Sequence, residues 1–185
     1  AFAAASGGVA VATCTSATSG CTITGLSNGT AYWVEVVGTN AAGSGPASAP
    51  RTTGTPRTTP GSPTGVTATS GAGQLTVAWA APQSAGGSPI TGYSVSAFTA
   101  PTGGSPVRSC STTGALTCVL TGLTNGVTYY VEAVAANAAG VGSVSSPRVA
   151  GVPMTVPAVV RSVVATPQDG RVLASWAAPV SNGGS

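Results

Sequence analysis

Apolar and polar residues alternate over short stretches of this 185-residue chain, and no stretch sustains a 3.6-residue period. The alternation is clearest at 74–79 (QLTVAW), 93–96 (YSVS) and 129–133 (YYVEA). A period of two places successive side chains on opposite faces of a β-strand. Turn residues separate these stretches, at SGAG before Gln74, at AGGSP around Gly86 and at Asn125-Gly126, which has the form of a hairpin turn. The pattern predicts an all-β fold.

The whole pattern recurs at a fixed interval. GLSNGTAYWVEVVGTNAAG begins at Gly25 and GLTNGVTYYVEAVAANAAG begins at Gly122, a step of 97 residues, and WAAP at Trp79 returns at Trp176 by the same step. Roughly seven short strands in each ~95-residue copy favour a two-sheet sandwich. The predicted units are the back part of one repeat at 1–54, a linker at 55–60, a complete repeat at 61–152 and the front part of a third repeat at 153–185.

This division places both chain ends inside a repeat, and two explanations stay open. The chain is a window on a longer repetitive protein, or neighbouring chains complete one another's open sandwiches head to tail by strand addition.

Charge is scarce: 5% of residues are charged, with six arginines, three acids and no histidine or lysine. No basic run could follow a phosphate backbone, so nucleic acid is not an expected partner. Acid-base catalysis would depend on three carboxyl groups. Glu35 and Glu132 occupy the same position in successive repeats, which excludes a glycosidase pair, and each is interpreted as a solvent-facing surface carboxylate. We therefore expect no enzyme and no cofactor. A surface this poor in charge favours tethering in something larger, or self-association.

The cysteines form two close pairs, Cys14 with Cys21 and Cys110 with Cys118. Zinc sites need shorter cysteine spacing or histidine partners, so disulfides are favoured over metal, with free buried thiols as the remaining alternative. Disulfides indicate an oxidising compartment and hence an extracellular location, secreted or on the cell surface. No run of about 18 apolar residues is present, so no membrane insertion is expected.

Several of these residues fall in a pattern that resembles the fibronectin type III family, in its bacterial secreted or cell-surface form. Trp79 with Pro82, then Ile90, Tyr93 and Val95, and then Leu123 six residues before Tyr129 carry the resemblance. It implies an immunoglobulin-like sandwich whose core markers are Trp79, Trp176, Tyr32, Tyr129, Leu26 and Leu123. The cysteine pairs are not general to the family but are compatible with a bacterial subgroup rich in Thr, Ala and Gly. No RGD tripeptide occurs, so an integrin role is not implied.

Trp33 and Tyr130 occupy one outward position in the two copies and form a candidate contact surface. Each either shields its own sheet, packs against a neighbouring chain or stacks on a sugar ring. We expect a non-catalytic structural repeat of an extracellular stalk, fibre or filament, whose partners are neighbouring repeats or identical chains. The alternatives are a carbohydrate-binding or spacer module beside a secreted polysaccharide-degrading enzyme, with polysaccharide as partner, and an adhesion module.

Overall fold

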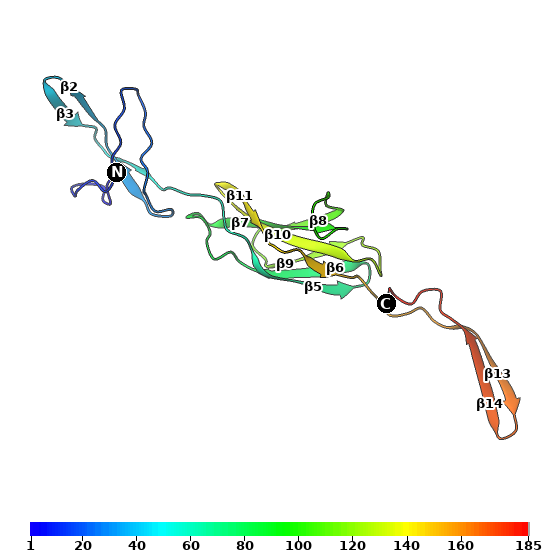
Figure 1. Ribbon diagram of the computed structural model, residues 1–185. Coiled ribbons are helices and arrows are strands. Elements are labelled where there is room, and N and C mark those ends of the chain that lie inside the picture. The colour runs from blue at the N-terminus through cyan, green and yellow to red at the C-terminus, as the bar shows by residue number, and fades with distance from the viewer. Residues whose placement is uncertain (185) are drawn as a thin grey trace.

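The computed structural model describes residues 1–184, and the regular elements in that range are all β-strands. The central part of the chain is a sandwich of two antiparallel sheets (Figure 1). One sheet has the order β5-β6-β9, with strands Thr64–Gly71, Gln74–Ala80 and Thr117–Thr121. The other has the order β11-β10-β7-β8, with β12 also pairing with β10; these strands are Gly140–Val144, Tyr129–Asn137, Ile90–Phe98, Arg108–Thr112 and Val149–Gly151. The predicted sandwich is present, with its final strand divided into β11 and β12.

The period-two alternation fills the space between the two sheets. Leu75 and Val77 of β6 face Val95 of β7 and Val131 of β10, and all four side chains are fully buried. Burial of one such side chain stabilises the fold by roughly 1.5–3 kcal/mol relative to its exposure. The Trp79 ring lies with its centroid 5.5 Å from that of Tyr93 and tilted by 54°, at the edge of the same core. The hydrophobic pattern thus sets which face of each strand is inward.

Two pairs of short strands precede the sandwich, and a hairpin follows it at the opposite end of an extended particle (Figure 1). The preceding pairs are β1 with β4 and β2 with β3; their bounds are Tyr32–Val34, Thr52–Gly54, Val37–Asn40 and Gly43–Ala47. The hairpin pairs β13 (Arg161–Gln168) with β14 (Arg171–Ala177).

Trp176 on β14 was expected as a core residue, but it is 62% exposed, whereas its counterpart Trp79 is 6% exposed. The reason is that β13 and β14 form a two-stranded sheet with no second sheet packed on it among residues 1–184. Burial of this tryptophan depends on an opposing sheet, which the local strand pattern does not supply.

The interpretation of Asn125-Gly126 as a hairpin turn was wrong. Strand β9 lies in one sheet and β10 in the other, so the turn carries the chain across the sandwich. Its groups bond to other loops: the Asn125 Oδ1 accepts from the Gly73 amide at 2.8 Å, and the Gly126 amide donates to the Pro153 carbonyl at 2.9 Å.

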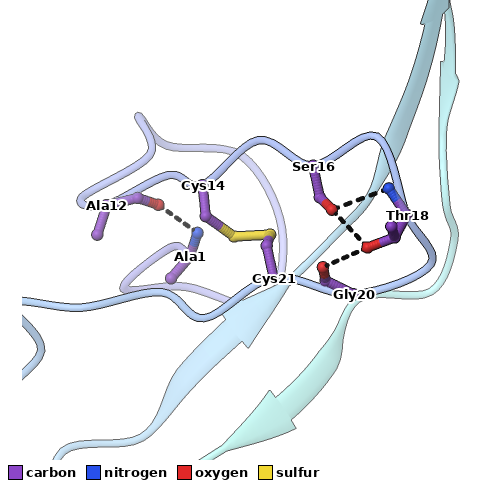
Figure 2. Close-up of a disulfide and its surroundings, with 7 residues drawn as sticks. All are labelled: Ala1, Ala12, Cys14, Ser16, Thr18, Gly20 and Cys21. Atoms are coloured by element: carbon purple, nitrogen blue, oxygen red, sulfur yellow. Dashed lines mark hydrogen bonds between the residues drawn. A yellow bond between two sulfur atoms is a disulfide. The ribbon is translucent and has the colours of Figure 1, made fainter.

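Both cysteine pairs form disulfides. Cys110 on β8 and Cys118 on β9 belong to different sheets, so their disulfide joins the two layers at one edge of the sandwich. Figure 2 shows the Cys14–Cys21 disulfide, which closes a loop in the N-terminal segment. The tip of that loop is held by Ser16, whose Oγ lies 2.8 Å from the Thr18 Oγ1.

Replacing Cys110 and Cys118 together by alanine is expected to lower the free energy of unfolding by about 2–3 kcal/mol, because the closed eight-residue separation restricts the unfolded chain. Chemical denaturation followed by tryptophan fluorescence measures the loss. The matched control replaces Cys14 and Cys21, whose loop lies outside the central sandwich. The unfolding of the central sandwich is followed through the exposure of Trp79. If the control variant lowers the free energy of that unfolding equally, the role given to the inter-sheet disulfide is contradicted.

Candidate functional site

The outer face of the larger sheet carries the aromatic and charged residues singled out in the sequence. Strand β10 presents Tyr130, Glu132 and Val134 outward, since Val131 and Ala133 between them are buried. The register with β7 places Tyr130 opposite Phe98 and Glu132 opposite Ser96. Phe98 faces outward as well, yet it is 5% exposed, so another group covers it.

Arg148 is the group that covers Phe98. Its guanidinium carbon lies 3.3 Å from the centre of the phenyl ring, within the range of a cation–π contact. The same guanidinium donates from Nε to the Glu132 Oε2 at 2.7 Å. Its Nη1 donates to the carbonyls of Ala100 at 3.1 Å and Gly103 at 2.8 Å. The side chains of Arg148 and Glu132 are 12% and 17% exposed. We call Phe98, Glu132 and Arg148, with the loop 100–104, the arginine clamp.

Backbone pairing explains why these residues meet. Strand β12 pairs with β10 so that Val149 faces Val131, which brings the preceding Arg148 beside Glu132. The loop 100–104 leaves β7 directly after Phe98 and bends back over it through Gly103 and Gly104, whose φ angles of 64° and 74° favour glycine. A planar guanidinium has five donors in a fixed fork, which suits one carboxylate and two carbonyls at once.

The N-terminal segment contains the same clamp, with its Arg and Glu 97 residues earlier in the sequence and its Phe and loop residues 96 residues earlier. Arg51 donates from Nε to the Glu35 Oε2 at 2.7 Å, and its guanidinium lies 3.4 Å from the centre of the Phe2 ring. Its Nη1 donates to the carbonyls of Ala4 and Gly7, at 3.0 and 2.8 Å. The recurrence of every contact indicates that the clamp is a property of the repeat.

The clamp corrects one interpretation and reveals two residues that sequence reasoning missed. Glu35 and Glu132 were read as solvent-facing carboxylates, but both are largely covered and bonded to arginine. Arg51 and Arg148 went unnoticed because each lies 16 residues from its glutamate. The available signal was the common 97-residue step that relates the two Arg–Glu pairs.

Trp33 and Tyr130 lie next to the clamps. Trp33 exchanges backbone hydrogen bonds with Phe2, at 2.8 and 3.0 Å. In the same way, Tyr130 pairs with Phe98 in the register of β10 with β7. Both aromatic side chains are half-buried. Their use as a contact surface for another molecule stays a prediction.

The remaining core markers hold the loop that precedes β10 and its N-terminal counterpart. The Tyr129 hydroxyl accepts a hydrogen bond from the Thr124 amide at 3.1 Å, and the Tyr32 hydroxyl accepts one from the Ser27 amide at the same distance. Leu123 is buried in the sandwich, while Leu26 is half-buried in the N-terminal segment. Tyrosines so placed fix the crossing of the chain between sheets.

Further chemistry on this face is sparse. A shallow groove of about 230 Å³ between β7, β8 and β10 is lined by small or apolar groups, among them Gly92, Ser94, Ser111, Val134 and Val141. Over residues 1–184, no group of three or more His, Cys, Asp or Glu side chains is placed to hold a metal ion. No helix in the described part of the chain is long and apolar enough to cross a membrane.

An antiparallel sandwich of two sheets, with a tyrosine hydroxyl bonded to the loop that crosses between the sheets and an arginine clamp on its outer face, is an immunoglobulin-like module. Residues 61–151 match the family model of the fibronectin type III domain, and they form a domain of that kind. No curated protein matches the chain.

Among the solved structures that the chain resembles are those of titin domains and of chicken CNTN1 domains. A structure of titin domains has a TM-score of 0.50 at 22% identity, covering 69% of this chain and 42% of the titin chain. The FN1–FN3 domains of chicken CNTN1 have a TM-score of 0.46 at 20% identity, covering 69% of this chain and 44% of the other. The chain thus spans less than half the length of either. At such identity the likeness to titin shows the fold alone: an all-β, fibronectin type III sandwich.

Replacing Arg148 by alanine is expected to cost about 1–3 kcal/mol of stability, since it uncovers Phe98 and leaves Glu132 half-buried without its partner. Amide hydrogen exchange in the loop 100–104 should rise at the same time. Arg148→Lys should be intermediate, because an ammonium cannot reproduce the planar fork. The matched control is Arg108→Ala, since Arg108 donates to the carbonyl of its own neighbour Val107. Unchanged exchange in the loop would contradict the clamp.

Proposed function

We propose that this chain is a non-catalytic structural segment of an extracellular stalk or fibre built from fibronectin type III repeats. The repeats are those delimited in the sequence, with parts at 1–54 and 153–185 around a complete repeat at 61–152. One observation carries the proposal: the Arg–Glu–Phe clamp occurs in two successive copies with the same contacts.

The two clamps use two of the three acids and two of the six arginines to brace the outer face of the repeat. A catalytic carboxylate must reach a bound substrate, whereas Glu35 and Glu132 lie against the guanidinium groups of their own sheets. Asp169, the third acid, lies in the turn between β13 and β14. The presence of the same stabilising cluster in two successive copies favours a structural role for the repeats over catalysis at a single site.

The disulfides support an extracellular location, because such bonds persist in oxidising compartments. The composition, rich in Thr, Ala and Gly, supports the bacterial secreted or cell-surface kind of repeat. We propose neighbouring repeats of the same chain as the principal partners, through the linkers at 55–60 and around 153–157.

A carbohydrate-binding role finds less support. Stacking on a sugar needs an open aromatic face, and Trp33 and Tyr130 are half-buried beside their clamps. For the adhesion role the sequence contains no specific motif.

Under the structural function, Tyr130→Ala leaves retention of the chain on insoluble polysaccharides unchanged. A pull-down on cellulose, chitin and starch, with Val134→Ala on the same face as the matched control, measures this. A selective loss of retention in Tyr130→Ala would favour the carbohydrate-binding alternative instead.

The stalk function itself is tested by lengthening the chain. Small-angle X-ray scattering compares the native chain with a version that contains one additional 97-residue repeat. Each added repeat should increase the maximum dimension by roughly 30–40 Å, the length of a nine-residue strand at ~3.3 Å per residue with its loops. A maximum dimension that stays constant would show that the repeats fold back on one another, and the stalk function would be wrong.

A further inference from the structure

The linkers between repeats are held by loops on both sides. At the first junction, the Gly29 amide donates to the Pro56 carbonyl at 2.9 Å. The Thr58 amide then donates to the Gly86 carbonyl at 2.8 Å, and the Gly61 amide to the Ser84 carbonyl at 3.0 Å. Gly29 belongs to the loop before β1, and Ser84 and Gly86 belong to the loop after β6. The linker thus bonds with the repeat before it and the repeat after it.

The second junction reproduces these bonds after 97 residues. The Gly126 amide donates to the Pro153 carbonyl at 2.9 Å, and the Thr155 amide donates to the Gly183 carbonyl at 2.8 Å. The Ala158 amide completes the set with the Ser181 carbonyl at 2.9 Å. Three matching hydrogen bonds at each junction indicate one geometry, used twice.

At each junction a glycine of one repeat lies directly against a glycine of the next. A Cβ on Gly29 would lie 3.1 Å from the Gly87 Cα, and one on Gly126 would lie 3.2 Å from the Gly184 Cα. A Cβ on Gly87 would lie 2.7 Å from the Asn28 carbonyl carbon and closer still to the Gly29 nitrogen. A non-bonded carbon needs about 3.5–4.0 Å from its neighbour, so any side chain at Gly87 must push the two repeats apart.

Glycine is required on this loop for a second reason. Gly86 and Gly87 have φ angles of 74° and 82°, and Gly183 and Gly184 have 82° and 93°. These values lie in the left-handed region, where only glycine is unstrained. The conformation places the Gly86 and Gly183 carbonyls toward the linker amides that they accept from.

The central repeat also anchors the linkers at its two ends. At the entering end, Asn137 is 7% exposed, and its Nδ2 donates to the carbonyls of Thr58 at 2.9 Å and Ala85 at 2.7 Å. At the leaving end, the Ser70 Oγ donates to the Val152 carbonyl at 2.6 Å, and the Met154 amide donates to the Gly71 carbonyl at 3.1 Å. Backbone hydrogen bonds therefore tie each linker to the neighbouring domain loops, although most linker side chains are exposed.

We propose that the Asn-Gly turn of one repeat and the Gly-Gly loop of the next form a stereospecific joint. This joint accepts as its partner only a following repeat that has glycine at both loop positions, and it holds consecutive repeats in one orientation. The inference rests on the proposed function as a tandem structural repeat, and it identifies the surface through which one repeat recognises the next.

Amide hydrogen exchange measured by nuclear magnetic resonance on the whole chain tests the joint. In the native chain the Gly29 and Thr58 amides, and likewise Gly126 and Thr155, should be protected. Gly87→Ala should raise exchange at Gly29 and Thr58 by about tenfold or more, because the loop and the turn can no longer meet. Exchange at Gly126 and Thr155 should stay at its native rate, since the second junction is intact.

The matched control is Gly104→Ala. Gly104 has a φ of 74°, so alanine meets the same kind of backbone strain, but a Cβ there meets nothing within 4 Å. Unchanged exchange at the Val95 and Val131 amides shows that each variant keeps the folded sandwich. Gly184→Ala should produce the converse result, with exchange raised at Gly126 and Thr155 alone.

Two results would overturn the joint: unprotected junction amides in the native chain, or a Gly87→Ala variant that exchanges like Gly104→Ala. Neither result concerns the increase in particle length with each added repeat. A chain that lengthens but has unprotected junctions is a flexible stalk, in which the joint is wrong and the proposed function stands.

Discussion

The packing of two sheets against each other is the interaction on which the other features depend. Leu75, Val77, Val95 and Val131 are fully buried between the sheets, and their burial sets the register of β6, β7 and β10. With this register in place, the outward positions of β10 meet those of β7, and Glu132 comes to lie within reach of Arg148. The two loop ends of the sandwich are also held at a fixed separation, which allows both ends to contact linkers.

A chain with 5% charged residues has few ion pairs available, and the structure uses them where the backbone needs support. Each clamp combines a ring contact, an ion pair and two hydrogen bonds to loop carbonyls through a single guanidinium. The low exposure of the pair shields it from solvent and salt, in contrast to the usual surface ion pair. This makes the clamp a means of closing the loop 100–104 without a larger hydrophobic core.

Glycine has an equally specific role at the junctions. Prolines at 56 and 60 limit the linker backbone, but proline alone would leave the angle between repeats free. The Gly-Gly loop removes side chains from the contact, so backbone groups of one repeat bond directly with the linker. In the proposed stalk, consecutive sandwiches related by this one geometry would form a regular rod.

Much of this architecture follows from the sequence by itself. Period-two alternation depends only on neighbouring residues, and the 97-residue step is found by comparing the sequence with itself. They predicted the all-β class and the sandwich, which the structure confirms, and they delimited the repeats. The close spacing of the cysteines favoured the two disulfides that form. Tertiary structure alone decided the burial of Glu132 under Arg148, since a contact between residues 16 apart depends on how β10 and β12 pair. It also decided that Asn125-Gly126 crosses between sheets, because that depends on which sheet each flanking strand joins. Trp176 is exposed because no second sheet packs on β13 and β14 within residues 1–184. Local sequence patterns thus specify the strands, whereas the clamps and the junctions depend on contacts between strands and loops that are far apart in the sequence.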